Sequence, residues 1–259
     1  MSNKLRTFTI NEYLNDYHVK FEGWDFSYIT QTGRMVTEPL LWCYTSKLLP
    51  YLKGINSLLD IGTGGGEFLE LLRPLPKETY ATEMYQPNIP IAKERLERYG
   101  VYVKVPPDDH HLPFENNFFD VIIDKHESYS VGEIRRILKS EGCFITQQVG
   151  DKNFIDMNDL FEYKDPDDEP WNLKFACEQL EKEGFYIIYR NEDFPKTRFF
   201  DLGAILYYLN AIPWQIGDFT IENYRHILSL IFDQINEEGF IEFTEHRFII
   251  IAKLETKFK

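Results

Sequence analysis

The strongest chemical signal in the sequence is a glycine-rich segment that an acid precedes, Asp60-Ile61-Gly62-Thr63-Gly64-Gly65-Gly66-Glu67. It follows a short apolar run and precedes a helical pattern, which is the context that a nucleotide-binding turn requires. Glycine permits a tight turn and lets the backbone approach a ligand closely. The dinucleotide fingerprint needs a third glycine where this chain has Glu67. An acid before the first glycine would repel a pyrophosphate but suits a cationic amino group. A structural turn without a ligand is the alternative.

Further polar side chains follow other predicted strands. Glu83 ends the second strand, where a carboxylate can accept hydrogen bonds from both hydroxyls of a ribose. The segment Asp124-Lys125-His126-Glu127-Ser128-Tyr129 follows the fourth strand, where open α/β sheets place their ligands. We interpret His126 as a candidate general base. The alternative is that His126 or Glu127 only contacts a cofactor or caps the next helix.

The elements that must position these residues alternate along the chain. Short apolar runs, nearly continuous rather than alternating, predict strands at 57–61, 78–83, 101–105, 119–124, 142–148, 184–189 and 246–252. Helical patterns lie between them at 67–72, 89–99, 131–139 and 171–183. This order predicts an α/β fold, a Rossmann-like seven-stranded, mostly parallel sheet with helices on both faces.

Two regions lie outside this alternation. Residues 1–54 predict a helical N-terminal cap segment, with a helix from Val36 to Leu52, and residues 55–259 form the main domain. Residues 198–240 predict an insertion before the last strand, with helices at 201–209 and 221–236, beside the active site. The acidic stretch 151–170, which contains two prolines, predicts a mobile loop.

The order of these motifs resembles the class I S-adenosylmethionine-dependent methyltransferases, over about residues 55–150 and the terminal strands. Asp60, Gly62, Gly64 and Gly66 match the first motif of that family, and Glu83 matches its ribose-binding acid. The segment 108–114 is similar to the family's D-x-x-x-L-P-F stretch, 117–122 to its sFDxV stretch, and 134–142 to its RxLKpGG stretch, with Ser140-Glu141 in place of Pro-Gly. The C-terminal half is similar to an uncharacterised bacterial subgroup, methyltransferase type 11-like.

The resemblance implies S-adenosyl-L-methionine as cofactor and methyl transfer as the activity. The cofactor-binding residues that we expect are Asp60, Gly62, Thr63, Gly64, Gly66, Glu83, Met84, Asp108, Asp109, Asp124 and Arg34. Arg34 follows Gly33 in a loop, where a cation could pair with the methionine carboxylate, although a surface arginine is an equal alternative. Trp24, Phe26, Tyr28 and Trp214 would line the substrate pocket or pack in the core.

Charge and composition narrow the function classes. Lys and Arg total 28 against 42 Asp and Glu, so the net charge of −14 disfavours broad nucleic-acid binding. The three cysteines include no CxxC pair, and the adjacent polar residues 108–111 would point in opposite directions, so no metal is expected. No signal peptide or membrane span is predicted, which favours the cytoplasm. We therefore expect transfer to an unidentified small molecule. An RNA or protein methyltransferase, or a non-catalytic cofactor-binding module, is the alternative.

Overall fold

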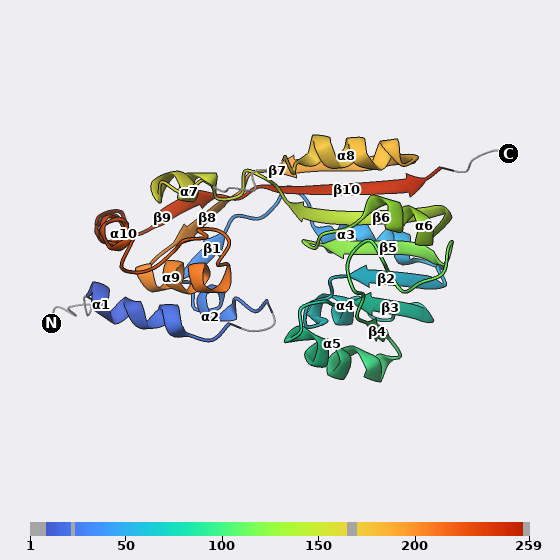
Figure 1. The fold of residues 1–259 in the computed structure, drawn as a ribbon, viewed down its shortest axis with the longest axis horizontal. Helices are drawn as coiled ribbons and strands as arrows, with labels where there is room; N and C mark the ends of the chain where they lie inside the picture. Colours follow the sequence, from blue (N-terminus) through green and yellow to red (C-terminus); the bar gives the residue numbers. More distant parts are fainter. Residues whose placement is uncertain (1–8, 22–23, 165–169, 256–259) are drawn as a thin grey trace.

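The computed structural model describes residues 9–21, 24–164 and 170–255. Two lobes lie side by side (Figure 1), and each has its own hydrophobic core. The sheet lobe contains residues 44–149, 171–193 and 247–254, and the second lobe contains residues 9–37, 154–164 and 196–244 as far as they are described. Within these described residues, no helix has the length and apolar character to cross a bilayer.

The sheet lobe is built on the predicted seven-stranded sheet, whose strand order is β4-β3-β2-β5-β6-β10-β7. Neighbouring strands from β4 to β6 run parallel, and only β10 runs antiparallel, to both β6 and β7. The predicted fold class is therefore confirmed. The strands are β2 (Ser57–Ile61), β3 (Glu78–Thr82), β4 (Tyr102–Lys104), β5 (Phe119–Lys125), β6 (Leu138–Val149), β7 (Phe185–Asp193) and β10 (Arg247–Leu254).

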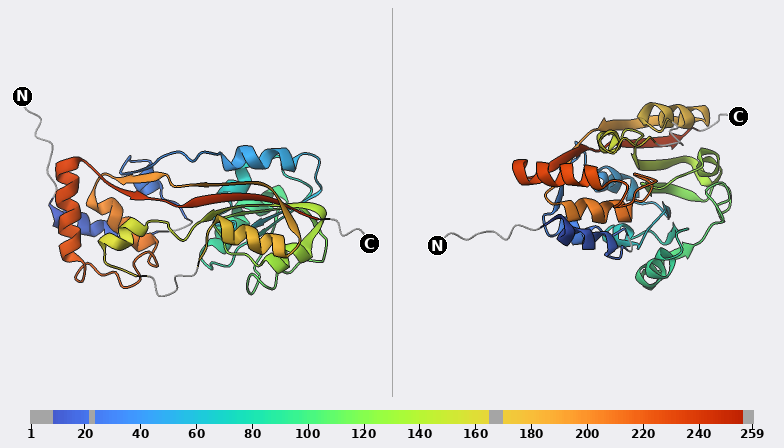
Figure 2. Two further views of the ribbon diagram at one scale, coloured as in Figure 1. Left: turned by 90° about the horizontal axis from the view of Figure 1, so that it is seen from above. Right: turned by 60° about the vertical axis from the view of Figure 1, so that its left-hand side comes forward.

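Helices cover both faces of this sheet (Figure 2). One face packs against α3 (Tyr44–Leu48), α4 (Glu67–Leu71) and α5 (Asn88–Leu96). The other face packs against α6 (Val131–Ile137) and α8 (Leu173–Lys182). Adjacent residues of one strand, such as Leu58 and Leu59, enter opposite cores, because successive side chains of a strand point to opposite faces. Burial on both faces explains why the strands read as continuous apolar runs.

The second lobe assembles three stretches of chain that are far apart in the sequence. Its antiparallel sheet has the order β1-β8-β9, formed by β1 (Met35–Thr37), β8 (Lys196–Phe199) and β9 (Ile241–Thr244). Its helices are α1 (Ile10–Tyr13), α2 (Ser27–Thr30), α7 (Ile155–Leu160), α9 (Leu202–Ala211) and α10 (Arg225–Glu238). Short 3-10 helices complete the chain at η1 (Leu14–His18), η2 (Leu49–Leu52) and η3 (Glu97–Tyr99).

The structure corrects the sequence expectations in this region. The helix that we predicted from Val36 to Leu52 begins only at Tyr44, because Val36 pairs with Arg198 in the small sheet. The segment 1–54 is thus divided between the lobes, and the predicted insertion 198–240 begins within β8 and ends directly before β9. The predicted loop 151–170 contains α7, while its residues 165–169 lie outside the described part.

Candidate active site

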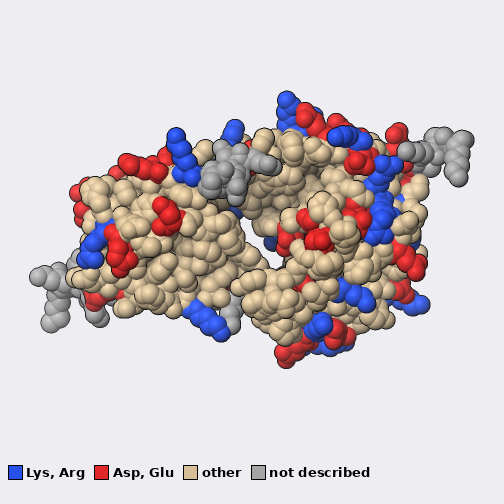
Figure 3. Space-filling model, in the orientation of Figure 1, with Lys and Arg blue, Asp and Glu red and all other residues tan. Residues whose placement is uncertain are grey.

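A cavity of about 830 Å³ lies between the lobes, at the end of the sheet where the parallel strands finish. In the space-filling view the surface is hollowed at this junction, and acidic atoms gather beside the hollow on the sheet side (Figure 3). The sheet lobe contributes Asp60, Gly62, Thr63, Gly64, Gly65, Glu67, Phe68, Arg95, Lys125, His126, Glu127, Val149 and Arg247. The second lobe and the links to it contribute Trp24, Asp25, Phe26, Met35, Asn153, Phe154, Tyr208, Ile212, Trp214, Gln215 and Glu245.

The glycine bend after β2 presents bare backbone to this cavity. Gly62 and Gly64 both have φ near +62°, a conformation that side chains other than glycine rarely adopt. A Cβ atom on Gly62 would lie 2.4 Å from Cγ of Glu127, and one on Gly64 would lie 3.7 Å from Cδ1 of Trp24. Glycine is therefore needed at Gly62 for both conformation and space. The bend is anchored by the Thr63 amide, which donates to the carbonyl of Thr82 at 2.9 Å.

Three carboxyl groups surround the bend, and each carries a raised pKa. Burial raises the pKa of Asp60 to about 7, although Thr63 Oγ1 donates to its Oδ2 at 2.7 Å. Burial also raises the pKa of Glu83, whose Oε1 accepts from the amide of Tyr85 at 2.7 Å. Burial again raises the pKa of Glu127, with a further contribution from the negative charge of Glu83. The positive charge of Lys125 and the hydrogen bonds that these groups accept thus offset only part of the cost of burying their ionised forms.

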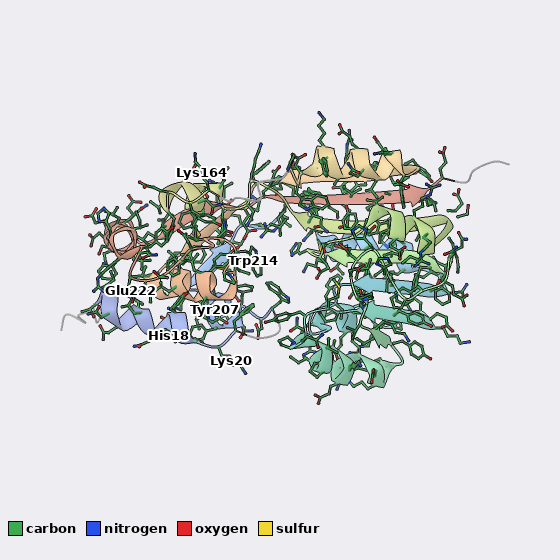
Figure 4. The ribbon with its side chains drawn as sticks, viewed as in Figure 1. His18, Lys20, Lys164, Tyr207, Trp214 and Glu222 are labelled. Atoms are coloured by element: carbon green, nitrogen blue, oxygen red, sulfur yellow. The ribbon has the colours of Figure 1, made fainter. Side chains whose placement is uncertain are left out.

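The opposite wall is aromatic and comes from the second lobe. Trp24 and Trp214 meet edge to face with ring centroids 5.8 Å apart. Figure 4 shows Trp214 on the side of its lobe that faces the sheet. Behind them Arg247 donates to Asn153 Oδ1 and pairs with Glu245 at 3.0 Å. This half of the cavity therefore combines the apolar rings of the two tryptophans with the Arg247–Glu245 ion pair, whose opposite charges offset each other.

Among the predicted cofactor residues, the structure brings Asp60, Gly62, Thr63 and Gly64 to the cavity. Gly66 lies behind them at the start of α4, with φ +84°, against Leu96. Glu83 is 4% exposed and lies beside the bend rather than in the cavity wall, and Met84 follows it, half-buried.

The other predicted residues lie at different distances from this group. Asp109 is close enough to Glu127 for its charge to raise the pKa of that residue. The carboxylate of Asp108 already has a partner in its own loop, because the ring of His111 hydrogen-bonds to it at 2.8 Å. Asp124 is fully buried, and its Oδ1 accepts from Thr146 and Gln148. It therefore ties β5 to β6 and does not line the cavity.

Arg34 is not brought to the predicted cofactor residues. It belongs to the second lobe, where its guanidinium group donates to Asp201 at 2.6 and 2.7 Å and to Asp16 at 2.9 Å. Both partners satisfy the cation within that lobe, so we no longer include Arg34 in the site. Tyr28, which we predicted in the aromatic wall, does not line the cavity. Its hydroxyl group donates to Asp16 within the second lobe.

Sequence reasoning missed Arg247, Glu245 and Tyr208 as lining residues. Arg247 is the second residue of the last predicted strand and the first residue of β10, and its place at a strand end is the signal that could have found it. Glu245 and Tyr208 carry no comparable signal, because the small sheet and α9 of the second lobe decide their position. No group of three or more His, Cys, Asp or Glu side chains in the described part of the chain comes together as a metal site.

Comparison with known proteins adds independent evidence. Residues 59–146 match a family model described as a methyltransferase domain. No curated protein sequence matches the chain significantly. The similar solved structures include a proposed methyltransferase from Bacillus halodurans, with 18% identity, a TM-score of 0.59, and coverage of 82% of this chain and 99% of that chain. The YcgJ protein of Bacillus subtilis gives 16% identity, a TM-score of 0.56, and coverage of 82% and 98%.

A third similar structure is a geranyl diphosphate methyltransferase in complex with SAM. It shares 14% identity with this chain at a TM-score of 0.50, and the match covers 81% of this chain and 83% of that one. At these identities the likeness concerns the fold. The family match over residues 59–146 includes the glycine bend, Glu83 and the segment after β5.

Proposed function

We propose that this chain, whose residues 59–146 match the methyltransferase domain model, is a class I methyltransferase that transfers a methyl group from S-adenosyl-L-methionine to a small-molecule acceptor. The observation that carries the proposal is the glycine bend, with the carboxyl groups of Asp60, Glu83 and Glu127 whose pKa values are raised, at one end of a cavity of about 830 Å³. A cavity of this size falls within the usual range for ligand sites.

The residues present fit this cofactor. Its sulfonium and ammonium groups outweigh its single carboxylate, and the positive charge that it would supply could compensate the carboxyl groups around the bend, whose pKa values burial raises. Gly62 and Gly64 offer backbone that a ligand can approach without meeting a side chain. Asp60 would hold the amino group, Glu83 the ribose hydroxyls, and Asp109 the adenine end. When bound, the cofactor supplies an electrophilic methyl group on sulfur.

The protein's own contribution is alignment. Methyl transfer is an in-line displacement, so the enzyme must hold the acceptor atom opposite the leaving sulfur. The glycine bend fixes one side, and the aromatic wall of Trp24, Phe26 and Trp214 would fix the other. This wall excludes water and suits an acceptor with an apolar or aromatic surface. The acidic surface gives little support to an RNA acceptor.

Calorimetric titration with S-adenosylmethionine tests the cofactor. We expect saturable binding, and Glu83→Gln should weaken it at least tenfold, because a neutral amide cannot accept from two hydroxyls as a carboxylate does. Glu78→Gln, at the opposite end of the same strand, is the matched control and should bind like the wild type. Absence of binding at millimolar cofactor would end this proposal.

Incubation with the cofactor labelled in its methyl group tests the acceptor. Fractions of small metabolites and, separately, total RNA are offered to the protein. Label in a small-molecule fraction supports the proposal. Label in RNA alone would replace the small molecule by an RNA acceptor, and binding without any transfer would indicate a cofactor-binding module.

A further inference from the structure

Two consecutive hydrogen bonds lead from the buried side chain of Trp42 through Gln147 to His126 in the cavity wall. The indole Nε1 of Trp42 donates to Oε1 of Gln147 at 2.8 Å, and Nε2 of Gln147 lies 3.0 Å from Nε2 of His126. Trp42 is 6% exposed and Gln147 is 4% exposed, so water does not replace these partners. Trp42 lies in the 38–43 link between the lobes, and Gln147 lies in β6.

The chemistry of these groups fixes where the imidazole proton is. An indole N–H can only donate, so the amide oxygen of Gln147 must face Trp42. The NH₂ group of Gln147 then faces His126 and also can only donate. Nε2 of His126 must therefore accept, which leaves the single proton of the neutral ring on Nδ1. A protonated ring would set an N–H against an NH₂ group.

The surroundings of His126 agree with a neutral ring. Although the ring is open to the cavity, enclosure by the protein lowers its pKa well below the usual range, and the positive charges of Arg247 and Lys125 add to this. The backbone of His126 has φ +69°, an unfavourable conformation that the amide's hydrogen bond to the carbonyl of Gln147 at 2.8 Å helps to hold. In the described residues, no group forms a hydrogen bond with Nδ1 of His126.

We propose that Trp42 and Gln147 are positioning residues that hold His126 as a neutral Nδ1–H donor facing the methyl acceptor, and that His126 is not a general base. A ring in this state has no free lone pair to take a proton. It can only recognise a lone pair on its ligand. The acceptor class that fits is a molecule with an oxygen or unprotonated nitrogen lone pair beside an apolar or aromatic body.

The tautomer follows from the geometry alone, whereas its use toward an acceptor rests on the proposed function. The ¹⁵N chemical shifts of the histidine side chains in the full-length protein without cofactor test the tautomer directly. We expect the Nδ1–H pattern for His126, unchanged between pH 6 and 8. His246 is an internal control with the opposite pattern, because its Nδ1 accepts from the amide of Lys152 at 3.1 Å.

The variant Gln147→Glu tests the positioning. A carboxylate can accept from both Trp42 and His126, so His126 should change to the Nε2–H or the protonated form, and its titration should move toward neutral pH. An Nε2–H or averaged pattern in the wild type would overturn the proposal, and so would an unchanged pattern in the variant. If the variant does not fold, the wild-type spectrum still decides. Failure of the cofactor titration would instead refute the proposed function and leave the tautomer intact.

A comparison of His126→Asn with His126→Gln tests whether the Nδ1–H donor of His126 contributes to methyl transfer. The side-chain nitrogen of Asn is bonded to Cγ, as Nδ1 is, whereas that of Gln is one bond further along the side chain. Methyl transfer should therefore survive better in the Asn variant, by about tenfold for one hydrogen bond. Equal losses in both variants would remove the donor role.

Discussion

Asp60 combines two properties that stability alone would not favour. It is 3% exposed at the end of β2, and burial holds its pKa at about 7. Its near partner within the glycine bend is the hydroxyl of Thr63, which compensates only part of the lost hydration. A buried, poorly compensated carboxyl is typical of functional sites, where a ligand completes the charge balance.

Removing this charge should stabilise the free protein. Because the folded pKa of Asp60 lies above its unfolded value near 3.9, its favourable contribution is present at low pH and is lost as the pH rises through about 7. Asp60→Asn keeps an oxygen for Thr63 and should raise the free energy of unfolding by about 2 kcal/mol at pH 8. Thermal unfolding at several pH values measures this gain, which should shrink toward pH 4.5. An equal or larger gain at pH 4.5 would contradict the assignment of the raised pKa.

At the scale of elements, the link from β1 to α3 connects the second lobe to the sheet. Arg34, directly before β1, joins the N-terminal stretch to the start of α9 through Asp16 and Asp201, and these side chains are only 14–20% exposed. After the link, the Tyr44 hydroxyl donates to the carbonyls of Asp124 and Ile145 at the ends of β5 and β6. One short segment therefore orders both the second lobe and the sheet edge.

The variant Arg34→Met separates these structural roles from cofactor binding. Two part-buried carboxylates would lose their cation, so the free energy of unfolding should fall by about 3 kcal/mol, while affinity for S-adenosylmethionine stays within twofold. Denaturant unfolding and calorimetry measure the two quantities. Arg198→Met is the matched control, since the ion pair between Arg198 of β8 and Glu242 of β9 is more exposed and its loss should cost less than about 1 kcal/mol. A large loss of cofactor affinity would return Arg34 to the site.

At the scale of the whole molecule, the cavity exists only because the two lobes meet. Trp24 of the second lobe reaches the glycine bend of the sheet lobe, where its Cδ1 lies 3.7 Å from the position of a Cβ on Gly64. A cofactor at the bend would therefore contact both lobes.

Trp24 should report this contact. The chain has four tryptophans, and cofactor binding should change the fluorescence of Trp24 because a ligand at the bend alters its surroundings. Trp24→Phe should remove most of the change. Trp171→Phe should keep it, since Trp171 packs against Tyr129 and Phe248 in the core between the sheet and α8. A full change without Trp24 would mean that Trp24 is not the tryptophan that senses the cofactor and would contradict the contact proposed at Gly64.

The sequence by itself determined the seven-stranded sheet and the position of the glycine bend at its edge. These features are written in local patterns: apolar runs of strand length, the spacing of glycines, and acids that directly follow strands. Phe119 to Asp124 is such a run, and β5 forms almost where the pattern predicts it. Asp60 and Glu83 could be identified from the same local patterns, because the position of each residue at the end of a strand fixes its position in the sheet.

Only the tertiary structure decided the rest, because those features depend on partners far away in the sequence. Arg34 could have met a cofactor carboxylate, but folding brings it to Asp201, 167 residues later. The sequence suggested His126 as a base, but only the fold shows that Gln147 hydrogen-bonds to its ring and that Trp42, 105 residues before Gln147, donates to Gln147. A local pattern gives the type of a side chain, whereas its proton and its charge are set by the groups that folding brings into contact with it.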